Sequence, residues 1–343
     1  MKPQVMNKTL IYMPVFNEER HLSLTIKSIL NQTHSDFHLL ISNNNSTDRS
    51  DEIIELYLTD GRITKITPNT HLSSIEHSLW IDDYISMNFN YCEYTIFVGG
   101  HDLWSAEYLK TLIDGMNENP NAAVVYTDTF ELDDSSKVIK KYDGYIVTTG
   151  VTKPLKPLHV LTGLSHNIIF GGIWRQSVKS RIKIRHKCMG VDHFLIAEAS
   201  LLGDIVYRYG GKIGLRRVEG AGDWSIYIKK HFGLNEISSE DGLKDFENQL
   251  EWVISLQERA IKGDKFYEHP TIFNSLLIAI INCYISRYWS HLSAFGAIEK
   301  FLNLTTINKS NDLINQTIAQ YRIYVSEIVI GQNTLTDDGE ISS

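Results

Sequence analysis

The chain has no excess of positive charge and no long apolar run. Its 33 Lys and Arg residues are outnumbered by 41 Asp and Glu residues, so the formal net charge is −8 at pH 7. This acidic balance argues against nucleic-acid binding as the main activity, because proteins that bind nucleic acids usually carry a basic footprint. An unbroken apolar run of about 18 residues, which a membrane-spanning helix would need, is absent, so no transmembrane helix is expected.

Cysteines are also scarce. The three present, Cys92, Cys188 and Cys283, are far apart, and no Cys-x-x-Cys pair or His/Cys cluster occurs. This pattern predicts neither a disulfide framework nor a zinc site, and it favours a reducing compartment. The opening segment MKPQVMNKTL also lacks the apolar core of a signal peptide. We therefore expect a cytoplasmic protein, with peripheral contact at the inner face of the membrane as an open alternative.

The composition is that of a globular protein with more than one part. Hydrophobic residues make up 43% and charged residues 22% of the 343 residues, which are ordinary values. The length exceeds the roughly 100–200 residues of one typical domain. We expect a first domain over residues 1–220, a helical extension over 221–332 and a flexible tail over 333–343.

Short apolar runs alternate with helical patterns over the N-terminal third of the chain. Strands are predicted at residues 9–15, 37–42, 62–66, 94–98 and 122–126. Helices are predicted at residues 18–30, from 48 onward, at 73–87 and at 105–116, with Ser46 or Asp48 capping the second and Asp102 or Ser105 the fourth. Such alternation is typical of βαβ units and a mainly parallel sheet, in which ligands bind beyond the carboxyl ends of the strands.

The pattern changes after the fifth predicted strand. Residues 128–165 have no helical period and are expected to be irregular, with a hairpin or a substrate lid among the options. Helical periodicity returns at 191–202, and it continues at 243–261, 270–292, 294–302 and 313–330. The C-terminal helices allow two interpretations. They pack on the first domain or in a homodimer, or the apolar segment 273–285 lies in a membrane interface.

The loop after the first strand reads Pro14-Val15-Phe16-Asn17-Glu18-Glu19. Pro14 ends the strand because it cannot donate a ladder hydrogen bond. Phe16 could stack on a flat ring. The alternative is an ordinary joint in which Glu18 and Glu19 favour the start of the next helix.

The loop after the second strand holds three asparagines, Asn43 to Asn45. Asparagine tolerates the positive φ of tight turns, so the simple interpretation is a turn followed by a helix cap. Asparagine amides also offer both donors and acceptors, which suits the edge of a nucleobase.

The loop after the fourth strand reads Gly99-Gly100-His101-Asp102. Two glycines let the backbone approach a ligand closely. An imidazole and a carboxylate at this edge could hold a divalent metal that bridges a diphosphate, while the alternative is a helix cap.

Two later segments carry groups of the right chemistry for the same site. Asp192, in Gly190-Val191-Asp192-His193, opens a predicted helix and could serve as a general base or only as a partner for the helix dipole. Arg216 and Arg217 follow a predicted Gly-rich turn. They could neutralise phosphates, although two adjacent arginines are more commonly an ordinary solvated pair on the surface.

The order of these motifs resembles that of the inverting family 2 glycosyltransferases with the GT-A fold. The resemblance rests on PVFNEE, a helix ending in SILNQT, FHLLISNNNSTD and YTIFVGGHDLWSAEYL, followed by FGGIWR, GVDHFL and LRR. It spans roughly residues 8–220. It implies a nucleotide-diphospho-sugar transferase sandwich, Rossmann-like and α/β, with a mainly parallel central sheet.

The resemblance also implies roles for individual residues. The nucleotide sugar would be bound by Pro14, Val15, Phe16, Asn17, Glu19, Asn43, Asn44, Gly100, Arg216 and Arg217. Asn43 stands where an Asp usually accepts a hydrogen bond from the base N3–H; its carbonyl can do the same, which favours UDP or dTDP donors. His101 and Asp102 fall at the end of the motif that holds Mn²⁺ or Mg²⁺, and Asp192 matches the catalytic base.

Two departures from the family pattern leave the metal requirement open. Gly99 and His101 stand at the positions of the first two aspartates of the metal motif, and Val191 replaces a carboxylate beside Asp192. The expected function is inverting, hexosyltransferase-like transfer to a hydroxyl of a glycan or lipid-linked glycan, in surface polysaccharide biosynthesis. The alternative is a catalytically degenerate subunit that binds nucleotide sugars or acts as a scaffold in a glycan assembly complex.

Overall fold

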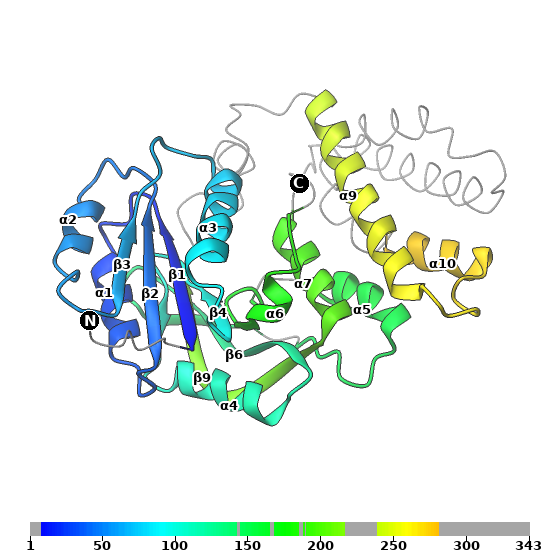
Figure 1. Ribbon diagram of the computed structural model, residues 1–343, viewed down its shortest axis with the longest axis horizontal. Helices are drawn as coiled ribbons and strands as arrows, with labels where there is room; N and C mark the ends of the chain where they lie inside the picture. Colours follow the sequence, from blue (N-terminus) through cyan, green and yellow to red (C-terminus); the bar gives the residue numbers. More distant parts are fainter. Residues whose placement is uncertain are drawn as a thin grey trace, which may run out of the picture. The chain divides into compact units, whose positions relative to one another are not determined.

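A computed structural model describes residues 8–142, 145–164, 168–184, 188, 190–216 and 239–280. Two compact units emerge (Figure 1). The described residues of the first lie within 1–151, 163–185 and 191–236, and those of the second within 152–162, 186–190 and 237–343. The chain therefore enters the second unit at residue 152 and returns to the first unit at residue 163.

One mixed sheet of nine strands forms the centre of the first unit. Its strands are β1 (Thr9–Val15), β2 (Phe37–Asn43), β3 (Ile63–Ile66), β4 (Tyr94–Phe97), β5 (Leu103–Trp104), β6 (Ala122–Leu132), β7 (Val138–Lys141), β8 (Ile173–Arg175) and β9 (Asp204–Arg216). They are ordered β3-β2-β1-β4-β8-β6-β9-β5, with β7 paired to β6. The first four strands are parallel to one another, and β8 is antiparallel to both of its neighbours. Consequently β1, β2, β3, β4, β6 and β9 all run in one direction, which confirms the mainly parallel sheet.

Helices cover both faces of this sheet. They are α1 (Leu22–Leu30), α2 (Ser50–Glu55), α3 (Ser74–Asn88), α4 (Tyr108–Glu118), α6 (Gln176–Lys179) and α7 (Val191–Leu202). Alternate residues of β1 face opposite layers, as the period of a strand requires. Ile11 and Met13 pack with residues of α1, α2 and α4, whereas Leu10 and Tyr12 pack with residues of α3. Figure 1 shows α3 across the strands from α1 and α2.

The common strand direction brings the ends of β1, β2, β3, β4, β6 and β9 to one edge of the sheet. We call it the carboxyl edge; its residues are those that follow Val15, Asn43, Ile66, Phe97 and Leu132, together with Arg216 at the end of β9. The hairpin of β6 and β7 turns at this edge, and its turn reaches the start of α1, where Asp134 forms ion pairs with Arg20 and His21. The predicted hairpin is therefore present.

Local structure departs from the sequence prediction at several points, one of which is the helix α5 (Lys156–Gly163) inside the stretch 128–165 that the sequence predicts to be irregular. Asp102 and Ser105 cap no helix, because the two-residue strand β5 follows Asp102 and α4 begins only at Tyr108. The α2 cap position is Arg49, although Asp48 Oδ1 still accepts the Ser50 N–H at 2.9 Å. The glycines before Arg216 do not break the chain into a turn; they lie inside the long strand β9, which pairs with β6 through a register shift.

The described part of the second unit is helical. It contains the short 3-10 helix η1 (Lys153–Leu155) and the helices α5 (Lys156–Gly163), α9 (Ser239–Ile261) and α10 (Pro270–Ile280). Trp252, fully buried on α9, belongs to its core, and Gln257 Nε2 donates to the Pro154 carbonyl at 3.0 Å. No helix among the described residues has both the length and the apolar character to cross a membrane. The helices predicted at 294–302 and 313–330, like the predicted tail, lie outside the described residues.

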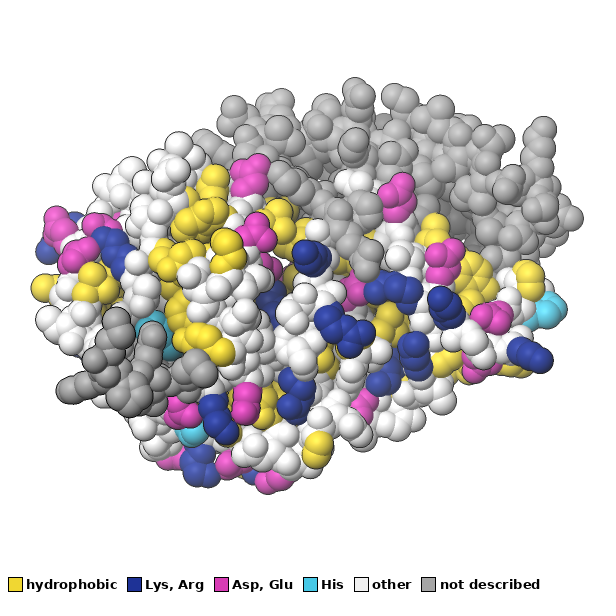
Figure 2. All heavy atoms as spheres, in the orientation of Figure 1, with side chains coloured by type: hydrophobic (Ala, Val, Ile, Leu, Met, Phe, Trp, Pro, Cys, Tyr) yellow, Lys and Arg dark blue, Asp and Glu magenta, His cyan; other side chains and the backbone are white. Residues whose placement is uncertain are grey.

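Surface charges around α2 pair locally. Acidic and basic side chains are interspersed around α2 at the left of the molecule (Figure 2). Arg49 pairs there with Glu52 at 3.2 Å, and Lys65 pairs with Glu55 at 2.6 Å. This part of the surface therefore lacks the continuous positive field that binds nucleic acids.

Candidate functional site

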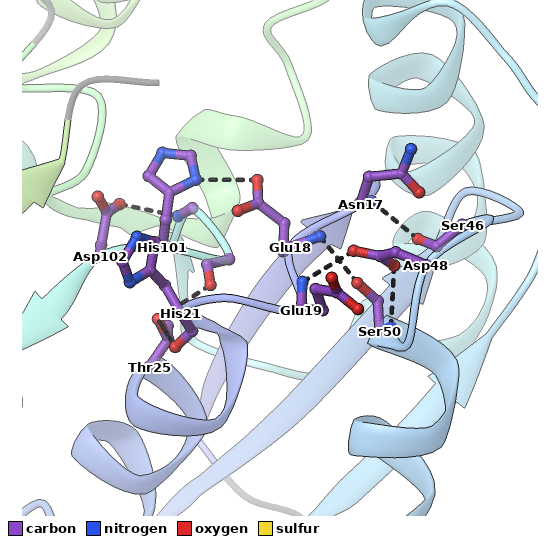
Figure 3. A network of polar contacts seen from close by, with 12 residues as sticks. Asn17, Glu18, Glu19, His21, Thr25, Ser46, Asp48, Ser50, His101 and Asp102 are labelled. Atoms are coloured by element: carbon purple, nitrogen blue, oxygen red, sulfur yellow. Dashed lines mark hydrogen bonds and ion pairs between the residues drawn. The ribbon is translucent and has the colours of Figure 1, made fainter. Parts of the chain in front are cut away.

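The loops that follow β1 and β2 interlock at the carboxyl edge (Figure 3). Asn17 has a φ of 56°, in the left-handed region that asparagine tolerates. Its N–H donates to Ser46 Oγ at 3.1 Å, and its side-chain oxygen accepts the Thr47 N–H at 2.8 Å. The motif residue Asn17 therefore shapes the loop, with an exposed side chain at the edge where ligands bind in such sheets.

A second set of contacts joins the start of α1 to the start of α2. The Glu19 N–H donates to Asp48 Oδ2 at 2.9 Å, and Glu19 Oε2 accepts the Arg49 N–H at 3.0 Å. Partial burial acts to raise the pKa of Asp48, but hydrogen bonds from Ser50 and from the Glu19 and Ser50 backbone outweigh it and lower that pKa. Asp48 is thus a carboxylate that organises the loops.

The three asparagines form the turn that the sequence predicts. Asn43 is 3% exposed; its Oδ1 accepts the Ser46 N–H at 3.1 Å, and its Nδ2 donates to Asp51 at 2.6 Å. Asn44 exchanges two hydrogen bonds with the backbone of Leu72, at 2.8 and 3.0 Å. Asn45 has a φ of 56°. The side chains of Asn44 and Asn45 hold the loop after β3 against the loop after β2. The side-chain oxygen of Asn43 has a second lone pair that can accept another hydrogen bond.

Two aromatic rings lie together at the ends of β1 and β3. The centroids of the Phe16 and His71 rings are 4.3 Å apart, and 42% of Phe16 is exposed. The His71 ring also contacts the Asn44 carbonyl, with 3.1 Å between Nδ1 and the oxygen. An exposed aromatic platform of this kind suits stacking with a flat base.

The loop after β4 brings His101 to the loop after β1. His101 Nδ1 lies 2.9 Å from Glu18 Oε1, and both side chains are about one fifth exposed. The Gly100 carbonyl accepts a hydrogen bond from Thr25 at 3.0 Å. Asp102 is buried, and its Oδ2 accepts the Gly99 N–H at 2.9 Å. Figure 3 shows that the two acidic side chains lie on either side of the His101 loop.

The remaining predicted residues lie at or near the same edge. Pro14 and Val15 are the last residues of β1 and pair with Ser42 and Asn43; the Val15 side chain is in the core, so only its backbone reaches the edge. Arg216 ends β9 opposite Leu132, and its side chain, like all of Arg217, lies outside the described residues.

Asp192 comes from a separate part of the chain. It is partly exposed and lies in the first turn of α7, whose bounds are those that the sequence predicts. It does not belong to the network of Figure 3. The structure therefore brings together the loops after β1, β2 and β4, while the base that the resemblance implies lies on another element.

The local geometry offers few candidate metal ligands. Among the described residues, no three His, Cys, Asp or Glu side chains are grouped to hold a metal. Two candidate donors lie near residue 99: a Cβ on Gly99 would lie 2.9 Å from Asp102 Oδ2 and 3.3 Å from His101 Nε2. One nitrogen and one oxygen donor do not make a complete metal site, so a divalent cation held by them would need further ligands from a bound diphosphate.

Sequence reasoning missed two residues of this site. The sequence alone indicates Glu18 only as a favourable residue near a helix start, and it indicates no role for His71. Their partners, His101 and Phe16, are far away in the sequence, so local patterns could not reveal either contact. The one available signal is position, since His71 follows the third predicted strand, and ligands bind beyond the carboxyl ends of strands in such sheets.

The match to a known protein family falls on the same region of the chain as the candidate site. Residues 10–72, which contain the loops after β1, β2 and β3, match the family described as Glycosyl transferase family 2. An uncharacterized glycosyltransferase of Rickettsia conorii is 28% identical over 142 residues, which are 41% of this chain and 22% of the relative. The match thus spans about a fifth of the length of that curated relative.

Solved structures share the fold. The structure of S. aureus TarS residues 1–349 in complex with UDP-GlcNAc aligns with a TM-score of 0.58 and 14% identity, covering 86% of this chain and 81% of that one. The structure of S. aureus TarS aligns with a TM-score of 0.55 and 13% identity, covering 87% of this chain and 49% of that one. The fold is of the GT-A type, which confirms the predicted α/β class.

Proposed function

We propose that this chain is an inverting glycosyltransferase that moves a sugar, of the hexose class, from a nucleotide-diphospho-sugar to a hydroxyl acceptor. The observation that carries the proposal is the convergence of Glu18, His101 and Asp102 at the carboxyl edge, beside an exposed aromatic platform. The family match over residues 10–72 supports it. So does the UDP-GlcNAc complex of a protein with the same fold.

The donor would be held by the loops after β1, β2 and β3. Its base stacks on Phe16 beside His71, and Asn43 offers a carbonyl oxygen to the N3–H of uracil or thymine. These contacts favour a UDP or dTDP donor. Arg216 and Arg217, at and beyond the end of β9, would balance the negative charge of the diphosphate.

Asp192 would act as the general base. Its carboxylate takes the proton of the acceptor hydroxyl while the hydroxyl oxygen forms a bond to the anomeric carbon. The bond between that carbon and the diphosphate oxygen breaks in the same displacement, so the nucleoside diphosphate leaves and the anomeric centre inverts. Asp192 suits this role because it lies, partly exposed, in the first turn of a helix.

The metal would be held by His101 and Asp102. When bound, Mn²⁺ or Mg²⁺ supplies positive charge that stabilises the departing diphosphate. Asp102 reaches this place because Gly99 leaves room for its carboxylate. The acceptor is a glycan or a lipid-linked glycan, and the pathway that we propose is surface polysaccharide biosynthesis.

The test measures sugar transfer and donor hydrolysis by mass spectrometry with UDP-, dTDP-, GDP- and CDP-sugars. Asp192→Asn should lower turnover by at least about 100-fold and leave donor affinity unchanged, since general-base catalysis contributes about 10²–10⁴-fold. Asp83→Asn, an exposed carboxylate on α3, is the matched control. Near-normal turnover of Asp192→Asn would remove Asp192 as the base. Donor binding without any sugar release from the wild type would favour the degenerate binding or scaffold subunit instead.

A further inference from the structure

We propose that a polar hollow at the opposite edge of the sheet is a second binding site, which takes one or two rings of a neutral glycan. The hollow lies within the first unit, between the end of α3, the segment before β4 and α6. Because β4 begins and β8 ends beside it, the hollow is at the edge away from Phe16 and His101. The inference therefore goes beyond the proposed transfer and concerns a different surface.

The hollow has the size of a ligand site and a polar lining. Its volume of about 400 Å³ is within the range of roughly 300–1,000 Å³ that is usual for small-molecule sites. An ion pair of 3.3 Å between Lys179 and Asp82 joins α6 to α3, so these two walls are held together. The polar side chains of the lining include those of Ser86, Asn90, Glu93, Arg175, Gln176 and Ser177.

Gln176 carries the observation that points to a ligand. The residue is 7% exposed, and its backbone N–H donates to the Glu93 carbonyl at 2.8 Å, which fixes its place beside the hollow. Its Oε1 is buried and has no hydrogen-bond partner among the described residues. Because an unpaired buried oxygen is costly, native proteins nearly always give it a donor. A hydroxyl group in the hollow would supply that donor.

Arg175 offers hydrogen-bond donors to the same space. Its Nε donates to the Ala122 carbonyl at 3.0 Å, and its Nη2 lies 3.7 Å from Met116 Sδ. Its Cζ lies 5.7 Å from the centroid of the Tyr94 ring. These contacts orient the guanidinium, yet they use two of its five N–H groups. The remaining N–H groups can donate to the oxygens of a ligand.

The lining favours a neutral sugar over an ion. Arg175 and Glu93 contribute one charge of each sign, so the lining has no net formal charge. A sugar hydroxyl both donates and accepts, so one ring can donate to Gln176 Oε1 and accept from Arg175. Tyr91, which is 38% exposed, lies between the lining residues Asn90 and Cys92. Its ring offers an apolar surface to the C–H face of a sugar beside the polar groups.

The test measures the binding of maltotriose, mannotriose and tri-N-acetylchitotriose to the full chain by saturation-transfer NMR, without a nucleotide sugar. At least one trisaccharide should bind the wild type. Gln176→Leu should weaken that binding by about 3–10-fold, the net effect of losing one hydrogen bond. Its Tm should be equal to or higher than that of the wild type, because the variant also removes an unpaired buried oxygen. A merely structural role of Gln176 would instead lower the Tm.

A variant that fills the hollow checks the location. Ser177→Trp should abolish binding, whereas Ser78→Trp, at an exposed position of α3 outside the lining, should leave it unchanged. UDP should not compete with the trisaccharide, since the two sites are at opposite edges. No binding of any of the three by the wild type, full binding by Ser177→Trp or Gln176→Leu, or competition by UDP would each overturn the proposal. Stabilisation of the same chain by UDP would leave the proposed function standing.

Discussion

The Gly99 N–H donates to Asp102 Oδ2 at 2.9 Å, and a Cβ on residue 99 would lie the same 2.9 Å from that oxygen. The family that the sequence resembles has an aspartate at this position, so glycine there first suggests a damaged metal motif. The structure gives another reason: the carboxylate of Asp102 folds back over the backbone of residue 99, and a Cβ at that residue would force the carboxylate to shift.

A side chain at position 99 should therefore lower the free energy of unfolding and weaken Mn²⁺ binding. Gly99→Ala should lower the free energy of unfolding by about 1–3 kcal/mol, the usual cost of overpacking a filled site. Gly99→Asp should bind Mn²⁺ more weakly than the wild type. Chemical denaturation and equilibrium dialysis measure the two effects. Gly61→Ala is the control, because no atom lies within 4 Å of its added Cβ. Tighter Mn²⁺ binding by Gly99→Asp would contradict this explanation.

Phe16 should contribute to nucleotide affinity and little to stability, since its ring is 42% exposed. Loss of a stacking ring costs about 1–3 kcal/mol of binding, so Phe16→Ala should weaken UDP or dTDP binding roughly 5–150-fold. Calorimetric titration checks the affinity, and thermal unfolding checks that the fold is intact. Met87→Ala, another exposed apolar residue at 73% exposure, should change neither quantity. Equal affinity of Phe16→Ala and the wild type would remove Phe16 from the base site.

His77 should make the fold sensitive to acid. Burial, together with the nearby charge of His71, lowers the pKa of His77 from 6.5 to about 4, and the ring forms a hydrogen bond with Ser42 at 2.7 Å. Between these two values the unfolded chain binds a proton that the folded chain does not. The free energy of unfolding should therefore fall as the pH falls through this window, by up to about 1.4 kcal/mol per pH unit.

The measurement for His77 is urea unfolding at pH 7.5, 6 and 5. His77→Gln removes the titrating group, so its stability relative to the wild type should improve as the pH falls. The exposed His269→Gln is the control and should follow the wild type. Parallel pH dependences of His77→Gln and the wild type would show that His77 does not couple folding to protons.

Lys179 should link α6 to α3 and β1. Its side chain is 12% exposed and lies 3.3 Å from Asp82. Burial acts to lower the pKa of Lys179, but Tyr12 and Asp82 outweigh it and raise that pKa, while burial raises the pKa of Tyr12 to about 12. Lys179→Ala should cost about 2 kcal/mol of stability, the scale of a hydrogen bond to a charged group. Denaturation of Lys179→Ala beside the exposed Lys183→Ala checks this, and equal stabilities would contradict it.

Much of the fold was predictable because its elements follow local periodicity. β1 and α7 have the predicted bounds, since continuous apolar runs and a regular helical period define them within the sequence. β5 was missed because two residues carry no period. β9 was not predicted as one strand because Gly210 and Gly211 suggest a turn, whereas pairing with β6 keeps the chain extended.

The site was predictable in its loops and not in its contacts. Periodicity placed Phe16, Asn43 and His101 at one edge of the sheet, because the ends of parallel strands meet there. The pairing of Glu18 with His101 joins residues 83 positions apart, so only the tertiary fold reveals it. The roles of Asp192, Arg216 and Arg217 stay predictions that come from the resemblance.

The central claim is that the carboxyl edge binds a nucleoside diphosphate together with a divalent cation. Thermal unfolding with UDP, dTDP, GDP or CDP, each in Mn²⁺, in Mg²⁺ and in EDTA, tests it most directly. A ligand at 100 times its Kd adds about 2.7 kcal/mol of stability. The account predicts a clear rise in Tm with UDP or dTDP in Mn²⁺ that is lost in EDTA. No rise with any of the four nucleotides would contradict it.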